Sequence, residues 1–185
     1  EDVRTQRPYY PVGPEGETAA DDPRLADAAY MAEVDWARSQ VGPLAQRGIQ
    51  LYVVTGLGKD REGVVETAAG SGAPVRSLFV PFTDRMAEVM SAADLVVSRA
   101  GAGTLAELIR CETPAILIPY PQAADDHQRA NAAYFEQQGG GLVLDQSRLG
   151  EMAALVPAVV ADDARLRAFR DNLRRMDQRN PLDEM

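Results

Sequence analysis

The sequence predicts an α/β fold in which helices cover both faces of a parallel sheet. Three observations lead to this class. Short apolar runs alternate with stretches of helical periodicity from about residue 25 onward, each apolar run ends in glycine, proline or a polar residue, and 45% of the 185 residues are apolar. A chain of this length and composition fills one domain core of ordinary size.

The order of elements follows from the same patterns. Strands are expected over residues 49–55, 75–80, 94–98, 114–119 and 141–144. Helices are expected over residues 27–46, 60–70, 84–92, 104–111, 126–138, 148–160 and 163–177. We expect residues 1–24, rich in proline and acids, to form a linker or arm, 25–160 the domain, and 161–185 a C-terminal amphipathic helix and tail.

Composition excludes several classes of protein. The 28 acidic residues outnumber the 19 basic ones, so the net charge of −9 repels the phosphate backbone of a nucleic acid. Cys111 is the single cysteine, which excludes an internal disulfide and a thiolate metal cluster. The sequence has neither the ~20-residue apolar run of a membrane helix nor the order of a signal peptide. We therefore expect a cytoplasmic protein.

The stretch "LVVSRAGAGTLAEL" passes from a predicted strand through two glycines into a predicted helix. Residues 101–106 fit the G-x-G-x-x-G/A pattern, in which bare backbone approaches a diphosphate and the N–H groups at the helix start face its charge. The alternative is a tight turn that needs glycine for positive φ or for close packing. Both interpretations stay open from the sequence.

An NAD-binding version of this motif requires an acid at the end of the following strand. That strand, "PAILIP", is followed by Tyr120-Pro121-Gln122, so the acid is missing. Glu107, one turn into the glycine-loop helix, could instead reach a ribose diol. It could equally be a solvated glutamate favoured near the helix N-terminus.

Two other loops follow predicted strands. In "VPFTDRMAEV", Thr83 or Asp84 is expected to cap a helix, while Phe82 and Met86 either sandwich a planar base or belong to the core. The pattern "TGLGKD" fails as a P-loop and predicts a surface turn, because Val53 replaces a glycine and Asp60 a hydroxyl residue.

The stretch "DDHQRAN" gathers polar side chains at the start of a helix. Asp125, Asp126, His127, Gln128 and Asn131 suit a polyhydroxylated ligand, or form an ordinary polar helix start. A metal site is disfavoured, because His127 has no second histidine or cysteine beside it. No metal or other cofactor is expected.

The tail "ARLRAFRDNLRRM" spaces four apolar residues along one helical face, with arginines around it. A basic amphipathic helix can lie on a membrane or dock on a neighbouring domain, and docking is the commoner case.

The three loops between residues 80 and 144 together resemble the carboxyl-terminal domain of the MurG-type glycosyltransferases, in both order and spacing. Weaker similarity extends over about residues 30–177. The resemblance implies the Rossmann-like, donor-binding half of a GT-B enzyme. It also implies transfer of N-acetylglucosamine from UDP to an undecaprenyl-linked muramyl pentapeptide in peptidoglycan synthesis.

The resemblance assigns roles within these loops. The first loop matches the part of the family that recognises uracil, the glycine loop matches the diphosphate cradle, and Glu107 matches a carboxylate on the ribose hydroxyls. The start of the following helix matches polar residues directed at the sugar. The donor-binding residues implied are Phe82, Thr83, Met86, Gly101, Ala102, Gly103, Thr104, Glu107, His127, Gln128 and Asn131. No catalytic base is assigned.

The sequence departs from the family pattern at its start. The family's domain opens with a strand and a G-G-S-Q-G loop, which nothing between Glu1 and Trp36 fits, and Gly13 stands where the family's linker usually has arginine. The first, central strand is therefore expected to be missing or atypical, which leaves its two neighbours with unpaired edges. We expect an unstable monomer, pairing with another chain, or a missing segment.

The expected partners are a UDP-sugar, an N-terminal acceptor-binding domain or subunit, and the lipid-linked acceptor through that domain. The full enzyme would be peripheral at the inner face of the cell membrane, and this chain alone would be inactive. Two alternatives stay open: a non-catalytic sugar-nucleotide-binding module, and another GT-B enzyme such as a UDP-sugar epimerase or a natural-product glycosyltransferase.

Overall fold

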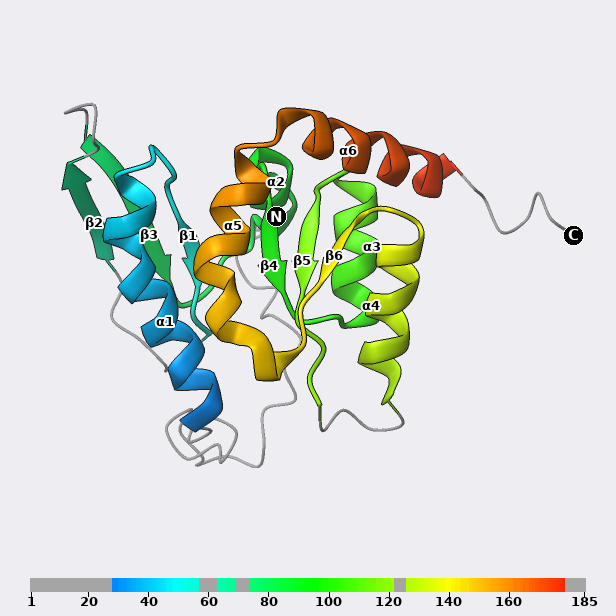
Figure 1. The fold of residues 1–185 in the computed structure, drawn as a ribbon, viewed down its shortest axis with the longest axis horizontal. Helices are drawn as coiled ribbons and strands as arrows, with labels where there is room; N and C mark the ends of the chain where they lie inside the picture. Colours follow the sequence, from blue (N-terminus) through cyan, green and yellow to red (C-terminus); the bar gives the residue numbers. More distant parts are fainter. Residues whose placement is uncertain (1–27, 57–62, 69–73, 122–125, 179–185) are drawn as a thin grey trace, which may run out of the picture. The chain divides into compact units, whose positions relative to one another are not determined.

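The structure, a computed structural model, describes residues 28–56, 63–68, 74–121 and 126–178 (Figure 1). The predicted linker over residues 1–24 and most of the "TGLGKD" turn lie outside the described residues. The chain divides into two compact units, Glu1–Phe82 and Thr83–Met185. The domain limits expected at residues 24 and 160 stay a prediction.

The described part of the first unit is a three-stranded sheet packed on one helix (Figure 1). Its elements are α1 (Ala28–Ala45), β1 (Tyr52–Val54), β2 (Gly63–Ala68) and β3 (Pro74–Val80). Ser77 and Phe79 alternate along β3 and are both buried. The Arg38 guanidinium of α1 lies 4.4 Å from the centre of the Phe79 ring, so the helix covers this face.

The helix expected over residues 60–70 is wrong, because Gly63–Ala68 forms β2. Strand β2 pairs antiparallel with β3, while β1 pairs parallel with it, so this sheet is mixed rather than parallel. Val64, Val65 and Thr67 are β-branched and favour a strand. Glu66 lies opposite Arg76 in the ladder and forms an ion pair of 3.2 Å with it. Cross-strand pairing thus outweighed the helical spacing of the segment.

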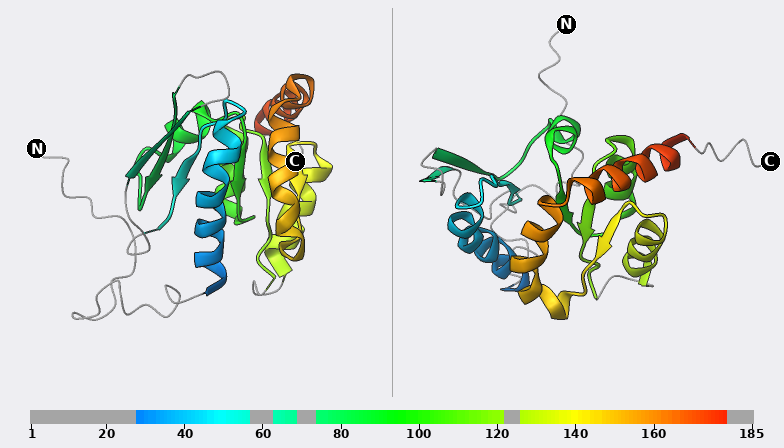
Figure 2. Two further views of the ribbon diagram at one scale, coloured as in Figure 1. Left: turned by 60° about the vertical axis from the view of Figure 1, so that its left-hand side comes forward. Right: turned by 45° about the horizontal axis from the view of Figure 1, so that its top comes forward.

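The second unit has the expected parallel sheet, with strand order β4-β5-β6. Its elements in chain order are α2 (Met86–Ala92), β4 (Val96–Ser98), α3 (Ala102–Arg110), β5 (Ala115–Leu117), α4 (His127–Gln137), β6 (Gly141–Val143), the 3-10 helix η5 (Gln146–Glu151), α5 (Met152–Val160) and α6 (Asp163–Gln178). Figure 2 shows α3 and α4 on one side of this sheet and α5 on the other.

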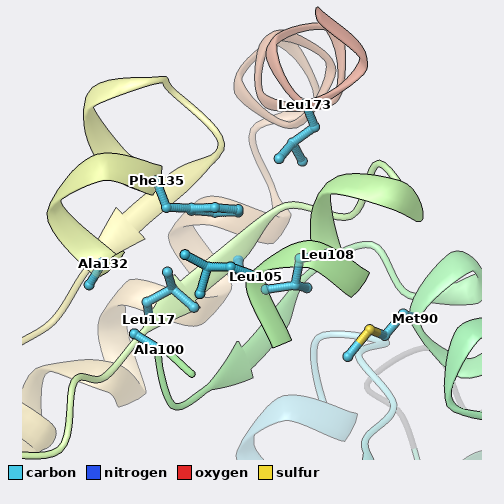
Figure 3. Close-up of a cluster of buried hydrophobic side chains, with 9 residues drawn as sticks. Met90, Ala100, Leu105, Leu108, Leu117, Ala132, Phe135 and Leu173 are labelled. Atoms are coloured by element: carbon cyan, nitrogen blue, oxygen red, sulfur yellow. The ribbon is translucent and has the colours of Figure 1, made fainter. Parts of the chain in front are cut away.

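The core of the second unit lies between β5 and the helices α3, α4 and α6. Leu105, Leu108, Leu117 and Phe135 converge there, and Leu173 approaches from α6 (Figure 3). All five side chains are buried. Ile116, which points to the opposite face of β5, is also fully buried. Both faces of this central strand are therefore covered, as expected for an α/β sheet.

The amphipathic helix α6 packs on α3 within its own unit. Its Leu166 and Leu173 are buried, while three ion pairs join its polar face to earlier segments. These pairs are Arg170–Asp94 at 3.1 Å, Arg174–Glu112 at 2.7 Å and Arg110–Asp177 at 2.9 Å. The apolar face of α6 is thus buried within its own unit, and docking on a neighbouring domain stays a prediction.

The outer edges of the parallel sheet differ. The edge of β6 is covered where the Glu136 carboxylate accepts a hydrogen bond from the Val143 N–H at 2.8 Å. Strand β4 pairs with β5 alone among the described strands, and its Val97 is 39% exposed. In the other unit β1 also has a single described partner.

Candidate functional site

The carboxyl ends of β4, β5 and β6 lie at one edge of the parallel sheet, because the three strands run in the same direction. The segments that follow them carry the polar residues highlighted by the sequence. Ligands of open α/β sheets bind at this edge.

The glycine loop leads directly into helix α3. Gly101 is the N-cap residue with φ −67° and ψ 144°, and it supplies no side chain to cap the helix. The first hydrogen bond of the helix runs from the Leu105 N–H to the Gly101 carbonyl at 3.0 Å. The N–H groups of Ala102, Gly103 and Thr104 therefore have no acceptor within the helix. Such groups, with the positive end of the helix dipole, attract an anion.

Neither glycine of this loop is required by the folded backbone. The positive-φ residues of the described chain do not include Gly101 or Gly103. A β-carbon on Gly103 would meet nothing within 4 Å, and one on Gly101 would make an ordinary contact of 3.7 Å with Thr104 Oγ1. The tight-turn explanation, which needs positive φ or close packing, is wrong for both positions. What the glycines provide is open backbone at the helix start.

Glu107 lies on the same face of α3 as Thr104, because residues three apart are neighbours on a helix. Its side chain is exposed. A carboxylate at this place can accept hydrogen bonds from a ligand that extends past the helix start.

The start of α4 is tied to both neighbouring loops. The Gln128 Oε1 atom accepts a hydrogen bond from the Tyr120 N–H at 3.0 Å, just after β5. The Asn131 Nδ2 atom donates to the carbonyl of Ala100 at 3.0 Å, directly before the glycine loop. One polar atom of each side-chain amide is therefore hydrogen-bonded to the backbone of a neighbouring loop. His127 is exposed at the first position of the helix, after Asp126 in the left-handed region with φ 56°.

Sequence reasoning missed Arg99, which joins the ends of all three strands. Its Nη1 atom donates to the carbonyl of Ile118 at 3.2 Å and to Gln146 Oε1 at 2.9 Å. Its guanidinium lies 5.2 Å from the centre of the Tyr120 ring. An arginine between an apolar strand and a glycine motif was an available signal for this residue. Gln146 offered none.

The loop expected to hold a base divides between the units. Phe82 ends the first unit and is 41% exposed, so its assignment to the core is wrong. Met86 starts the second unit's helix α2 and packs partly against the core. The expected cap is also wrong, because the N-cap residue is Arg85. The Thr83 hydroxyl instead accepts a hydrogen bond from the Arg85 N–H at 3.1 Å.

Asp145 shapes the end of β6. Its carboxylate accepts hydrogen bonds from the Ser147 hydroxyl at 2.7 Å and the Ser147 N–H at 2.9 Å, and these bonds lower the pKa of Asp145. The carboxylate therefore fixes the turn that begins η5 while it is ionised.

Within the described ranges, no three His, Cys, Asp or Glu residues are grouped so that they could hold a metal ion. The same ranges contain no helix both long and apolar enough to cross a bilayer.

The fold and this edge define an α/β domain with an anion-receptive helix start. The chain belongs to the family described as "Glycosyltransferase family 28 C-terminal domain", whose model matches residues 32–178. The resemblance inferred from the three loops is thereby confirmed.

Several curated relatives carry the name UDP-N-acetylglucosamine–N-acetylmuramyl-(pentapeptide) pyrophosphoryl-undecaprenol N-acetylglucosamine transferase, among them two from Opitutus terrae and Sorangium cellulosum. The protein of Opitutus terrae is 56% identical over 151 residues, which are 82% of this chain and 40% of the relative. The protein of Sorangium cellulosum is 43% identical over 127 residues, 65% of this chain and 31% of the relative. The chain thus spans less than half the length of these relatives.

A solved structure, that of Acinetobacter baumannii MurG, shares the fold. It is 30% identical in sequence with a TM-score of 0.53, and the match covers 60% of this chain and 34% of that one. This similarity agrees with the expected fold class, which is the α/β fold of the C-terminal domain of a GT-B glycosyltransferase.

Proposed function

We propose that this chain is the UDP-N-acetylglucosamine-binding part of an inverting glycosyltransferase that acts on lipid-linked muramyl pentapeptide in peptidoglycan synthesis. The named relatives and the family membership support this function, and the relatives are more than twice as long as the matched part.

One observation carries the proposal: the fold requires neither glycine at the start of α3, and both leave three backbone amides accessible at the helix N-terminus. A diphosphate is the part of a UDP-sugar that such a helix start binds. Glu107, on the same helix face, then receives the ribose hydroxyls. Phe82, Thr83 and Met86 recognise the uracil, and His127, Gln128 and Asn131 face the sugar.

In transfer, the acceptor hydroxyl displaces UDP at the anomeric carbon. Negative charge grows on the leaving diphosphate, and the amides of Ala102, Gly103 and Thr104 stabilise it without reorganising. We propose that this step needs no metal, since the helix start does the work that a cation would do. The site contributes donor binding and leaving-group stabilisation, and the base that activates the acceptor is not assigned.

The acceptor-binding part, and through it the lipid-linked acceptor at the inner face of the cell membrane, are the partners this function requires. The chain alone is accordingly inactive in transfer. Transfer from UDP-N-acetylglucosamine to a lipid acceptor by the purified 185-residue chain would contradict this half-enzyme assignment.

Calorimetric titration with UDP-N-acetylglucosamine, UDP, UDP-glucose and NAD tests the binding function. We expect both UDP and UDP-N-acetylglucosamine to bind and NAD to give no heat. Binding of NAD without UDP would overturn the proposal. A preference for UDP-glucose over UDP-N-acetylglucosamine would instead favour another GT-B enzyme as the source of this domain.

A further inference from the structure

Arg99 holds the start of the glycine loop by hydrogen bonds to the segments that follow β5 and β6. Its side chain reaches the carbonyl after β5 and the amide oxygen of Gln146 after β6. The next residue, Ala100, is fully buried, and its carbonyl is held by Asn131. The backbone that enters the loop is therefore fixed from two sides, while the amides of residues 102–104 stay open.

The position of Gln146 is itself well determined. Leu144, two residues earlier, is buried and donates its N–H to the Leu117 carbonyl at 2.9 Å. Asp145 then caps η5 through Ser147, and Gln146 is the first residue of that helix. Sheet pairing and a helix cap thus place the Gln146 oxygen 2.9 Å from Arg99 Nη1.

We propose that Gln146 is a positioning residue for nucleotide binding. Its side-chain oxygen orients the Arg99 guanidinium, and Arg99 in turn holds the glycine loop so that its amides face the diphosphate. The inference rests on the proposed function. Gln146 itself touches no substrate in this account and acts only through Arg99.

The expected effect of removing the Gln146 oxygen on UDP affinity depends on the fraction of chains whose glycine loop is in the binding conformation. Without the Gln146 oxygen, Arg99 loses its link to η5, and residues 99–101 sample further orientations. The apparent affinity for a ligand falls in proportion to the fraction of chains in the binding conformation. A hydrogen bond to a charged group corresponds to a factor of about tenfold or more, and because Arg99 keeps its bond to the Ile118 carbonyl we expect a decrease of about fivefold to tenfold.

Three variants of the 185-residue chain separate positioning from general stability. Gln146→Leu keeps the size of the side chain and removes the acceptor, so UDP should bind about fivefold more weakly or worse. Gln146→Glu keeps an acceptor for Arg99 and should bind UDP within about twofold of the unsubstituted chain. Arg148→Leu, the matched control, removes the exposed ion pair with Glu151 in the same 3-10 helix and should leave UDP affinity unchanged.

Amide hydrogen exchange without ligand gives a second readout. Gln146→Leu should speed exchange of the Leu105 amide, which donates to the Gly101 carbonyl at the start of α3, and Arg148→Leu should not. A double-mutant cycle with Arg99→Leu completes the test, because Gln146→Leu should add nothing once Arg99 is removed.

Additive effects in the cycle, or unchanged UDP affinity and loop exchange in Gln146→Leu, would overturn the inference while the proposed function stands. If the unsubstituted chain bound no UDP, both would fall, and the exchange data would show whether the loop is at least held by Gln146.

Discussion

Two glycine-rich segments of the second unit look alike in sequence and differ in structure. In Gly139-Gly140-Gly141 the fold demands glycine: Gly139 has φ +74°, and a β-carbon on Gly141 would collide with the Ala115 carbonyl on β5. In Gly101-Ala102-Gly103 the fold demands it at neither glycine. The space around the position of an added β-carbon therefore distinguishes the two kinds of glycine. Where a β-carbon would collide, packing requires glycine, and where it would meet open space, packing leaves the residue free to serve a ligand.

The largest effect is expected in the packed segment. Gly141→Ala places a methyl group against backbone of the adjacent strand, so β5 and β6 must move apart. We expect the free energy of unfolding to fall by about 3 kcal/mol or more, measured by thermal and denaturant unfolding. Gly150→Ala is the control, because a β-carbon there meets nothing within 4 Å. Equal stability of the two variants would contradict the contrast drawn between the segments.

The open segment should respond in the opposite way. Gly103→Ala replaces glycine in the first turn of α3 and should stabilise the unliganded fold by up to ~1 kcal/mol. The added methyl group obstructs the approach of a diphosphate to the amides, so we expect the Kd for UDP to rise at least tenfold, corresponding to ~1.4 kcal/mol. Calorimetry and thermal unfolding of the same samples measure both quantities.

Ala106→Gly, one turn later on the exposed side of α3, is the matched control. It should lose up to ~1 kcal/mol of stability and keep its affinity for UDP. Gly103→Ala with unchanged affinity would remove the glycine loop from the nucleotide site.

Glu107 tests the second part of the proposed site. Glu107→Gln should weaken UDP binding about fivefold to tenfold, because a carboxylate accepts stronger hydrogen bonds from ribose hydroxyls than an amide does. Stability should be unchanged, since the side chain is exposed. Glu151→Gln, which loses an exposed pair with Arg148, serves as the control. A Glu107 variant that binds UDP normally would place the ribose elsewhere.

Asn131 separates a sugar contact from a structural link. Asn131→Ala removes the donor to the Ala100 carbonyl and should cost about 1 kcal/mol of stability and about fivefold in UDP affinity. Because UDP lacks the N-acetylglucosamine group, a loss of UDP affinity reports on the glycine loop rather than on a contact with that group. Weaker binding of UDP-N-acetylglucosamine alone, with UDP unaffected, would show that Asn131 acts solely on the sugar.

A smaller effect on stability is expected when Asp145 is protonated at low pH. The hydrogen bonds from Ser147 lower the pKa of Asp145 in the folded chain, so this carboxylate stabilises the fold above its ordinary pKa of about 4. That contribution is lost as the pH falls through the lowered value. Asp145→Asn should flatten part of the decline in melting temperature below about pH 4, and an unchanged pH profile in that range would remove Asp145 from this role.

The parallel sheet and the glycine loop could be predicted because their signals are local. Apolar runs marked β4, β5 and β6, and the glycines stood between a strand and a helix. The segment Gly63–Ala68 could not be predicted in this way, since its partner Pro74–Val80 decides its structure. Hydrogen bonds between distant segments, such as Asn131 to Ala100 and Arg99 to Gln146, likewise depend on the fold. No regular spacing of residues in the sequence indicates them.

The central claim is that the bared amides at the start of α3 hold a UDP diphosphate. Titration of the ¹⁵N-labelled chain with UDP, followed by NMR, tests it most directly. We expect large, saturable shifts of the Ala102, Gly103 and Thr104 amide signals, much smaller shifts at Gly139–Gly141, and no saturable response to NAD. Saturable UDP binding that leaves the amides of residues 102–104 unshifted would contradict it.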